Sequence, residues 1–397
     1  MLRLLRNATL FAPEARGRRD LLLAAGRVAA IAPELPPLPA AYGDAATEED
    51  LGGAIVIPGL LDAHVHLIGG GGEAGPATRV PPVQLSQLTR AGITTVVGVL
   101  GTDGTTRTVA DLVARTYGLR EEGLSAYCYT GAYELPVPTL TGSIRRDIVY
   151  VDPIIGVGEL AISDHRSSQP TLDELLRVAS DCHVAGLMTH KAGFLHLHLG
   201  DGRRGLELIR AALDQTELPP RVFHPTHINR QKALFSEACA LARRGCTVDV
   251  TAFPEEDPGD GLLATDAIAR WLADPTLPNA RLTCSSDGAG CMPVFGEGGR
   301  IVAMDVGRAD TLIAALSDLT AAGVALEDAL PVFTRNVADQ LRLPRKGRLE
   351  IGADADLVVL RGDPQDPREL AVDGVLAGGR WMVRGGEVVV PGTFERR

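Results

Sequence analysis

The chain has 397 residues, 45% of them hydrophobic and 22% charged, so it can bury a large core and is not disordered. Its net charge of −11, with no basic cluster, argues against a nucleic-acid partner. No apolar run reaches the length of a membrane span, and the N-terminus does not resemble a secretory signal. The six cysteines lack metal or disulfide spacing, which predicts reduced thiols and a cytoplasmic protein.

The two ends of the chain share one pattern. Residues 1–55 contain short apolar runs separated by turns, for example residues 21–31 with a bend at Gly26. Residues 346–397 return to this pattern, with runs at 355–360 and 375–390. We therefore expect a small β-sandwich domain built from both termini, flanking a middle domain of residues 56–345.

The middle segment alternates β-branched apolar runs with helical patterns. Strands are expected at residues 54–61, 94–100, 125–130, 154–162, 194–199, 222–227, 247–252 and 281–286. Helices are expected at residues 106–122, 172–185, 206–215, 231–244 and 262–273. Eight alternating strands predict an α/β protein with a (β/α)8 TIM-like barrel, whose chemistry lies at the carboxyl ends of the strands.

The first predicted strand leads into two histidines. The apolar run 54–57 ends at Pro58-Gly59, and His64 and His66 follow two residues apart. Side chains at this spacing on a strand share one face, so both imidazoles can reach one divalent metal ion. The glycine run that ends at Glu73 supplies a loop flexible enough to line a pocket.

Further polar residues lie at the other strand ends. Two metal ions fit this set better than one, and together they would activate water and polarise a carbonyl. Asp287, after the last strand, is then the natural proton shuttle. The set comprises Glu159, His196 or His198, His227 and Asp287.

Two alternatives stay open at this point. Glu159 interrupts an apolar strand and needs a partner, which is either a metal or an arginine. Only one of His196 and His198 needs to be a ligand. The remaining histidines are interpreted as ordinary core or surface residues, namely His165, His183, His190 and His224.

Several longer motifs resemble the isoaspartyl dipeptidase (β-aspartyl peptidase) family of the amidohydrolase superfamily. They are the tetraglycine loop with Glu73, the segment Val97-Gly-Val-Leu-Gly-Thr-Asp103, the motif Ser163-Asp-His-Arg166 and the motif Thr226-His-Ile-Asn-Arg230. The resemblance runs nearly end to end and includes Gly352-Ala-Asp-Ala-Asp-Leu, which is typical of the superfamily's β domain.

The resemblance implies a zinc-dependent metalloprotease that forms homo-oligomers and binds two Zn²⁺ per subunit. The metal ligands it implies are His64, His66, Glu159, His198, His227 and Asp287, with Asp287 also the general base. Glu73 would hold the substrate's amino group, and Tyr133 would polarise the scissile carbonyl. The implied substrate-binding residues are Gly71, Thr102, Arg166, Arg230 and Cys291.

Two positions depart from the family pattern. Glu159 stands where the family has a carbamylated lysine, and none of the three lysines of this chain occupies that position. Cys291 stands where a substrate-facing serine is expected. A glutamate is shorter, so the strand must approach the metals closely, which Gly158 permits; otherwise one metal site is weak.

Two arginines and one glutamate beside a metal centre favour a small zwitterionic substrate, because guanidinium groups bind carboxylates strongly. We therefore predict metal-dependent hydrolysis of β-aspartyl (isoaspartyl) dipeptides. The main alternative is another amidohydrolase acting on a cyclic or N-acyl amide, such as a dihydroorotase-like, hydantoinase-like or deacylase-like enzyme. A catalytically silent paralogue is a further alternative, and the complete ligand set argues against it.

Overall fold

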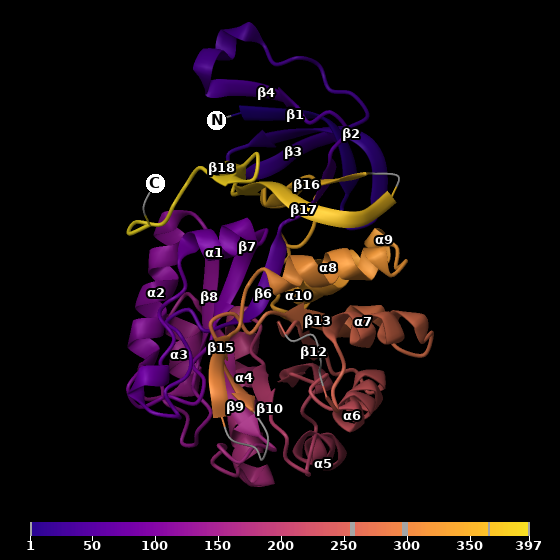
Figure 1. Ribbon diagram of the computed structural model, residues 1–397. Helices are drawn as coiled ribbons and strands as arrows, with labels where there is room; N and C mark the ends of the chain where they lie inside the picture. Colours follow the sequence, from indigo (N-terminus) through magenta and orange to yellow (C-terminus); the bar gives the residue numbers. More distant parts are fainter. Residues whose placement is uncertain (1, 255–258, 296–300, 364–365, 396–397) are drawn as a thin grey trace.

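The computed structural model describes residues 2–254, 259–295, 301–363 and 366–395. Strands from the two ends of the chain lie together above the middle segment (Figure 1). The middle segment forms a ring of parallel strands surrounded by helices. The predicted fold class is confirmed.

The terminal segments form one nine-stranded sheet in the order β19-β18-β17-β16-β5-β1-β2-β3, with β4 also paired to β1. Its strands are β1 (Leu2–Phe11), β2 (Ala15–Ala24), β3 (Arg27–Ala32), β4 (Ala46–Asp50), β5 (Ile55–Pro58), β16 (Leu357–Asp363), β17 (Asp366–Ala377), β18 (Arg380–Arg384) and β19 (Glu387–Val388). Antiparallel pairing of β5 with β16 joins the two ends of the chain.

The central strands of this sheet are buried on both faces. Val56 and Val359 pack into a hydrophobic core formed by residues of the terminal segments themselves. Their neighbours Ile55, Ile57 and Val358 pack into the core shared with the barrel. This alternation follows the two-residue period of a strand and explains why β5 is apolar at every position.

The barrel contains eight parallel strands. They are β6 (Leu60–Val65), β7 (Ile93–Gly98), β8 (Ser125–Thr130), β9 (Ile154–Ile162), β10 (Leu195–Leu199), β11 (Phe223–Thr226), β12 (Val248–Thr251) and β13 (Leu282–Ser285). Strands β6 to β11 pair in chain order, and β12 pairs with β13. The ring closes through the hydrogen bond from Ile228 N to Asp249 O, 3.2 Å, and the one from His66 N to Gly288 O, 2.8 Å.

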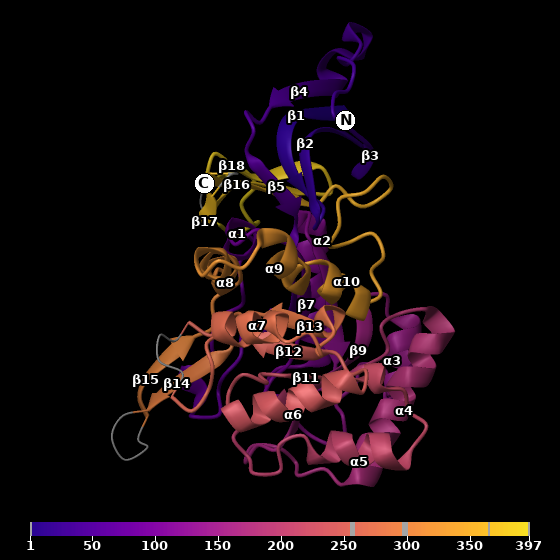
Figure 2. The same ribbon diagram turned by 90° about the vertical axis from the view of Figure 1, so that its right-hand side faces the viewer.

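Helices cover the outside of the barrel, and α8, α9 and α10 separate it from the sheet (Figure 2). The described α-helices are α1 (Leu85–Arg90), α2 (Val109–Glu122), α3 (Ile144–Tyr150), α4 (Leu172–Thr189), α5 (Glu207–Gln215), α6 (Lys232–Arg243), α7 (Ala264–Ala273), α8 (Thr311–Ala321), α9 (Leu326–Phe333) and α10 (Arg335–Gln340). A hairpin of β14 (Cys291–Phe295) and β15 (Ile301–Val306) projects from the barrel. Val337 and Ala338 of α10 pack against Leu61 and Phe194 inside the barrel, and so close its amino-terminal end.

The prediction of one barrel strand over residues 54–61 was wrong. The run is divided between β5 of the sheet and β6 of the barrel, and Gly59 lies between them. A Cβ atom at Gly59 would lie 2.1 Å from Thr94 Oγ1, so only glycine fits where the chain crosses from sheet to barrel. The other seven predicted barrel strands are confirmed to within two residues at each end.

Asp62 of β6 forms hydrogen bonds to Ser286, which follows β13. Its carboxylate accepts hydrogen bonds from the backbone N–H groups of His64 and Ser286, each 3.2 Å, and from the Ser286 hydroxyl. Because Asp62 is fully buried, desolvation raises its pKa to about 7 despite these bonds. The first and last strands of the barrel are therefore joined next to His64.

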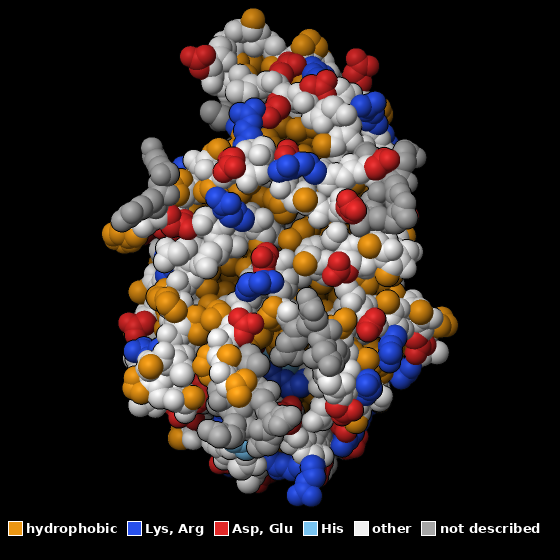
Figure 3. All heavy atoms as spheres, viewed as in Figure 1, with side chains coloured by type: hydrophobic (Ala, Val, Ile, Leu, Met, Phe, Trp, Pro, Cys, Tyr) orange, Lys and Arg blue, Asp and Glu red, His pale blue; other side chains and the backbone are white. Residues whose placement is uncertain are grey.

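The surface carries both signs of charge. On the face drawn in Figure 3, acidic and basic side chains are interspersed, without a continuous patch of either sign. Among the described helices, none has the length and apolar character needed to span a membrane. All six cysteines are free thiols, in agreement with their spacing.

A buried ion pair connects the sheet to the barrel. Lys346 Nζ lies 2.5 Å from Asp356 Oδ2 and 3.0 Å from Asp354 Oδ2, and it donates to Ser125 Oγ of β8 at 2.6 Å. The Lys346 and Asp356 side chains are 8% and 6% exposed. Removing Lys346 would leave the buried Asp356 carboxylate with the N–H of Gly378, 2.6 Å away, but without a counter-charge.

We predict that Lys346→Met lowers the free energy of unfolding by about 3–5 kcal/mol, because it strands a buried carboxylate. Arg345→Met is the matched control, since Arg345 also pairs with Asp354 but is 57% exposed; it should cost no more than about 1 kcal/mol. Urea denaturation of both variants measures the difference. Equal losses would show that burial does not strengthen the Lys346 pair.

Candidate active site

The six predicted metal ligands converge at the carboxyl end of the barrel. His64 lies on β6 and His66 just after it, Glu159 lies on β9 and His198 on β10, while His227 and Asp287 follow β11 and β13. None of the six is more than 8% exposed. Their ligand-type atoms form three overlapping groups that could hold a metal ion.

Glu159 lies at the centre of the cluster, and its two oxygens face different histidines. Oε1 is 3.4 Å from His64 Nε2 and 3.5 Å from His66 Nε2. Oε2 is 3.0 Å from His198 Nδ1 and 3.7 Å from His227 Nε2. Among the described residues, the ion-pair partners of Glu159 are all histidines, so the alternative of an arginine partner was wrong.

Asp287 completes the group around the first histidine pair. Its Oδ1 atom is 3.4 Å from His64 Nε2 and 3.1 Å from His66 Nε2. One candidate position is therefore surrounded by His64, His66, Asp287 and one oxygen of Glu159. The other is surrounded by His198, His227 and the second oxygen of Glu159.

A β-bulge turns Glu159 into the barrel. Leu195 and Leu197 of β10 are two residues apart, but they pair with Val157 and Leu160 of β9, which are three apart. Val157 and Leu160 both pack on the outer core, so the extra residue allows Glu159 to face inward. A Cβ atom at Gly158 would lie 2.7 Å from His196 Cβ, so glycine permits the close approach of these strands.

Local backbone strain positions two further ligands. His227 has φ of 61° and Asp287 has φ of 52°, in the left-handed region that ordinary residues avoid. Both lie where a barrel strand ends, and the turn directs each side chain toward Glu159 or His64. Gly101 approaches from β7, because a Cβ atom there would lie 2.7 Å from His66 Cε1.

The electrostatics of the cluster favour carboxylates over carboxylic acids. Burial by itself would raise the pKa of Glu159, but His64 and His198 hold it well below its usual range. Burial would also raise the pKa of Asp287, but His64 and His66 hold it well below its usual range. Burial lowers the pKa of His227 to about 3, so its imidazole is neutral and can act as a ligand.

Several atoms in the cluster fit a cation that they would share. His64 Nε2, His227 Nε2 and Asp287 Oδ1 are buried and have no hydrogen-bond partner within the described part of the chain. Leaving such atoms unpaired is costly. Imidazole nitrogens and carboxylate oxygens are the ligands that zinc and similar divalent metals prefer.

None of the three lysines reaches this cluster. Lys191 Nζ donates to the carbonyl groups of Ile148, Val151 and Ile154, 2.7–2.9 Å away, at the amino-terminal end of β9. Lys346 pairs with Asp356. Lys232 begins α6 and is exposed. Glu159 therefore lies at the centre of the cluster with no lysine beside it.

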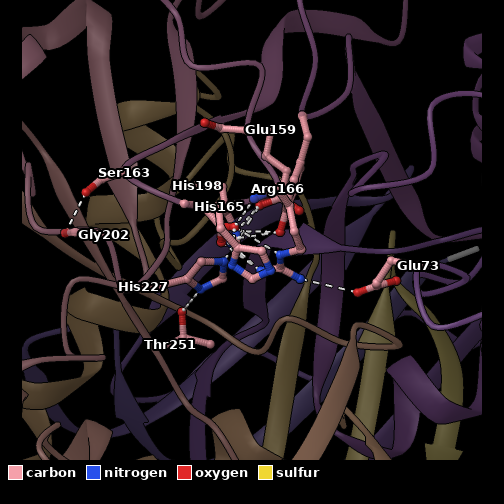
Figure 4. A network of polar contacts seen from close by, with 12 residues as sticks. Glu73, Glu159, Ser163, His165, Arg166, His198, Gly202, His227 and Thr251 are labelled. Atoms are coloured by element: carbon pink, nitrogen blue, oxygen red, sulfur yellow. Dashed lines mark hydrogen bonds and ion pairs between the residues drawn. The ribbon is translucent and has the colours of Figure 1, made fainter.

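Arg166, Tyr133 and Glu73 lie beside the cluster, next to His198. Arg166 Nη1 lies 3.2 Å from Glu73 Oε1, and its guanidinium lies 5.4 Å from the centre of the Tyr133 ring. Figure 4 shows Arg166 reaching from His198 toward Glu73. Tyr133 Oη is 2.7 Å from His198 Nδ1, and burial raises the pKa of Tyr133 well above 10, so the phenol keeps its proton.

The other predicted substrate residues lie on neighbouring loops. Arg230 follows His227 and lies 5.6 Å from the centre of the Phe253 ring. Gly71 packs against Cys291, since a Cβ atom at Gly71 would lie 2.8 Å from Cys291 Cβ. Burial raises the pKa of Cys291 to about 11, which makes it a neutral thiol. Thr102 follows Gly101 and is half-buried.

Two residues of the site were not predicted from the sequence. Asp164 accepts from Arg166 Nε at 3.1 Å and Nη2 at 2.8 Å, and lies 3.1 Å from His198 Nε2. Arg107 donates to the carbonyl groups of Gly70 and Gly71 at 2.8 and 2.9 Å and so holds the glycine loop. Asp164 belongs to a motif that was noticed, whereas Arg107 had no sequence signal.

The chain is similar to proteins of known families. Residues 55–382 match the model of the amidohydrolase family. The chain is 38% identical to the β-aspartyl dipeptidase of the thermophilic, keratin-degrading Fervidobacterium islandicum AW-1, solved in complex with a β-Asp-Leu dipeptide; 98% of each chain is covered, with a TM-score of 0.88. This similarity confirms the predicted resemblance to isoaspartyl dipeptidases.

More distant similarities support the fold. An imidazolonepropionase of a Ruegeria species is 25% identical, with 84% of each chain covered. Dihydropyrimidinase from Brevibacillus agri NCHU1002 is 17% identical with a TM-score of 0.65, and 100% of each chain is covered. At that identity, the dihydropyrimidinase shares the fold alone.

Proposed function

The chain belongs to the amidohydrolase family, and we propose that it hydrolyses the amide bond of β-aspartyl (isoaspartyl) dipeptides. The observation that carries the proposal is the similarity, at 38% identity over 98% of the chain, to a dipeptidase bound to β-Asp-Leu. The charged groups near the cluster support it, because Arg166 and Glu73 suit the opposite charges of a free dipeptide.

Two zinc ions are the proposed cofactor. His64, His66 and Asp287 would hold the first, and His198 and His227 the second, with one oxygen of Glu159 on each side. When bound, the metals would activate water and polarise the scissile carbonyl. The closed arrangement of buried imidazoles and carboxylates supports this proposal.

Asp287 is the proposed proton carrier. Its carboxylate takes a proton from the attacking water as the hydroxyl adds to the carbonyl carbon. It returns the proton to the departing amine nitrogen when the carbon–nitrogen bond breaks, so that aspartate and a free amino acid leave. Tyr133 keeps its phenolic proton and can donate a hydrogen bond to the carbonyl oxygen.

The substrate's ends are held by the surrounding loops in this proposal. Arg166 and Arg230 bind carboxylates, and Glu73 binds the amino group. Asp164 keeps Arg166 directed into the site through two hydrogen bonds. Thr102, the backbone at Gly71 and the thiol of Cys291 complete the pocket. We further propose that the enzyme is a cytoplasmic homo-oligomer.

A cyclic amide is the alternative substrate class. The 25% identical imidazolonepropionase and the glutamate at position 159 favour it. A substrate panel separates the two classes. With zinc supplied, we expect kcat/KM for β-Asp-Leu to exceed the values for α-Asp-Leu, dihydroorotate, a hydantoin and N-acetyl amino acids by at least ~100-fold. Preference for either ring compound would replace the dipeptide proposal.

We predict that His64→Asn and His227→Asn each lower bound zinc from about two ions per subunit to about one or fewer and abolish activity, because neutral imidazole is the ligand. His190→Asn is the control, since His190 is exposed at the end of α4 and its left-handed φ of 60° suits asparagine. Elemental analysis of folded protein measures the loss. Unchanged zinc in a folded variant would remove that histidine from the ligand set.

We also predict that amidating the C-terminal carboxylate of β-Asp-Leu lowers kcat/KM of the wild type roughly tenfold to 150-fold, through about 1.5–3 kcal/mol of lost charge-assisted bonding. Either Arg166→Met or Arg230→Met should erase this preference, depending on which guanidinium holds that end. Arg203→Met, an exposed arginine in the loop after β10, should keep it. If the wild type hydrolyses both forms equally well, these arginines do not bind the carboxylate.

A further inference from the structure

A chain of buried polar residues extends from His64 into the barrel interior. His64 Nδ1 lies 2.8 Å from His196 Nε2, and His196 Nδ1 lies 3.0 Å from His224 Nδ1. His224 Nε2 lies 3.2 Å from Thr283 Oγ1, which donates to Asp249 Oδ1 at 2.6 Å. All five residues have no measurable exposure.

Asp249 determines the direction of the hydrogen bonds. Its carboxylate accepts from three hydroxyl groups: Thr283 at 2.6 Å, Thr226 at 2.7 Å and Ser285 at 2.5 Å. Each hydroxyl has one proton to donate. The competing acceptor of Thr283, the carbonyl of Val248, is 3.4 Å away, so the Thr283 proton lies toward Asp249.

This direction passes through both imidazoles. Because Thr283 has donated its proton, it can only accept from His224 Nε2–H. A neutral imidazole has one N–H, so His224 Nδ1 must accept from His196 Nδ1–H. His196 Nε2 then accepts from His64 Nδ1–H. Both imidazoles are fully buried beside the rings of Tyr129 and Phe194, 5.2 and 5.1 Å away, and among the described residues no carboxylate forms an ion pair with either, so a second N–H on either ring would be a costly buried charge.

The end of the chain is His64 Nε2. With one proton fixed on Nδ1, His64 leaves Nε2 to bind a cation, and Nε2 faces Glu159 Oε1 and Asp287 Oδ1, each 3.4 Å away. Two carboxylates and the Nε2 lone pair at one point repel each other unless a cation lies among them, and a metal ion there takes the place of a proton on Nε2. The hydrogen bonds that begin at Asp249 therefore prepare His64 as a metal ligand.

We propose that His196, His224, Thr283 and Asp249 form a positioning relay that fixes the tautomer and orientation of His64 for metal binding. The inference rests on the metal chemistry of the proposed function but on no particular substrate. None of the four residues belongs to the candidate metal-ligand groups. They extend the usual partnership of a metal-bound histidine with a carboxylate through two imidazoles and one hydroxyl.

Thr283 gives a clean test because valine has nearly its shape. In the full-length protein loaded with Zn²⁺, Thr283→Val should weaken zinc binding by about 10–100-fold, measured by competition with a chromophoric chelator. Thr283→Ser keeps the hydroxyl and should bind zinc as the wild type does. Thr95→Val is the matched control, because Thr95 is also fully buried in the barrel and its hydroxyl has no partner among the described residues.

Wild-type affinity in Thr283→Val, or equal losses in the serine and valine variants, would overturn the relay. Nitrogen-15 spectra of histidine-labelled wild-type protein provide a second test that needs no folded variant of the relay. They should show His196 protonated at Nδ1 and His224 at Nε2, and the reverse tautomers would refute the proposal. Zinc binding with these tautomers but without hydrolysis of β-Asp-Leu would leave the relay intact and refute the proposed substrate.

Discussion

The burial of the Glu159 carboxylate is the constraint on which the rest of the site depends. The side chain is 1% exposed and lies within an apolar strand, where an uncompensated charge would cost several kcal/mol or more. Four imidazoles from β6, β10 and β11 surround it, and no single strand could supply them. A closed parallel barrel brings these strand ends together around one carboxylate.

The residues inside the barrel form layers that support the buried charge of Glu159. Near its amino-terminal end, Leu61, Phe194 and Val337 form an apolar plug. Above the plug lie the hydrogen-bonded His196, His224 and Asp249, and the metal-ligand cluster lies beyond them. Polar side chains in this layer take the place of apolar ones, which costs hydrophobic stabilisation. In return, they connect the cluster by hydrogen bonds to β12 and β13. The left-handed backbone at His227 and Asp287 also costs stability, and it directs both side chains into the cluster.

Local sequence patterns predicted most of the fold. Seven barrel strands were recognised because apolar, β-branched runs alternated with helical ones, and local periodicity survives in a barrel whose neighbouring strands are also neighbours in sequence. Residues 54–61 were wrongly predicted as one strand because β5 and β6 are both buried at every position and only Gly59 separates them. Periodicity cannot show that one apolar run serves two sheets.

The sequence by itself determined which residue types stand at the strand ends, and hence a converging set of His64, His66, either His196 or His198, His227 and Asp287. The family resemblance selected His198. It could not determine how Glu159 turns inward, because the bulge depends on the register of β9 against β10. It also could not find Arg107 or the bonds of His224, whose partners are far away in the chain. Motifs record local chemistry, whereas the direction of a side chain and the partner that satisfies it are decided by long-range packing.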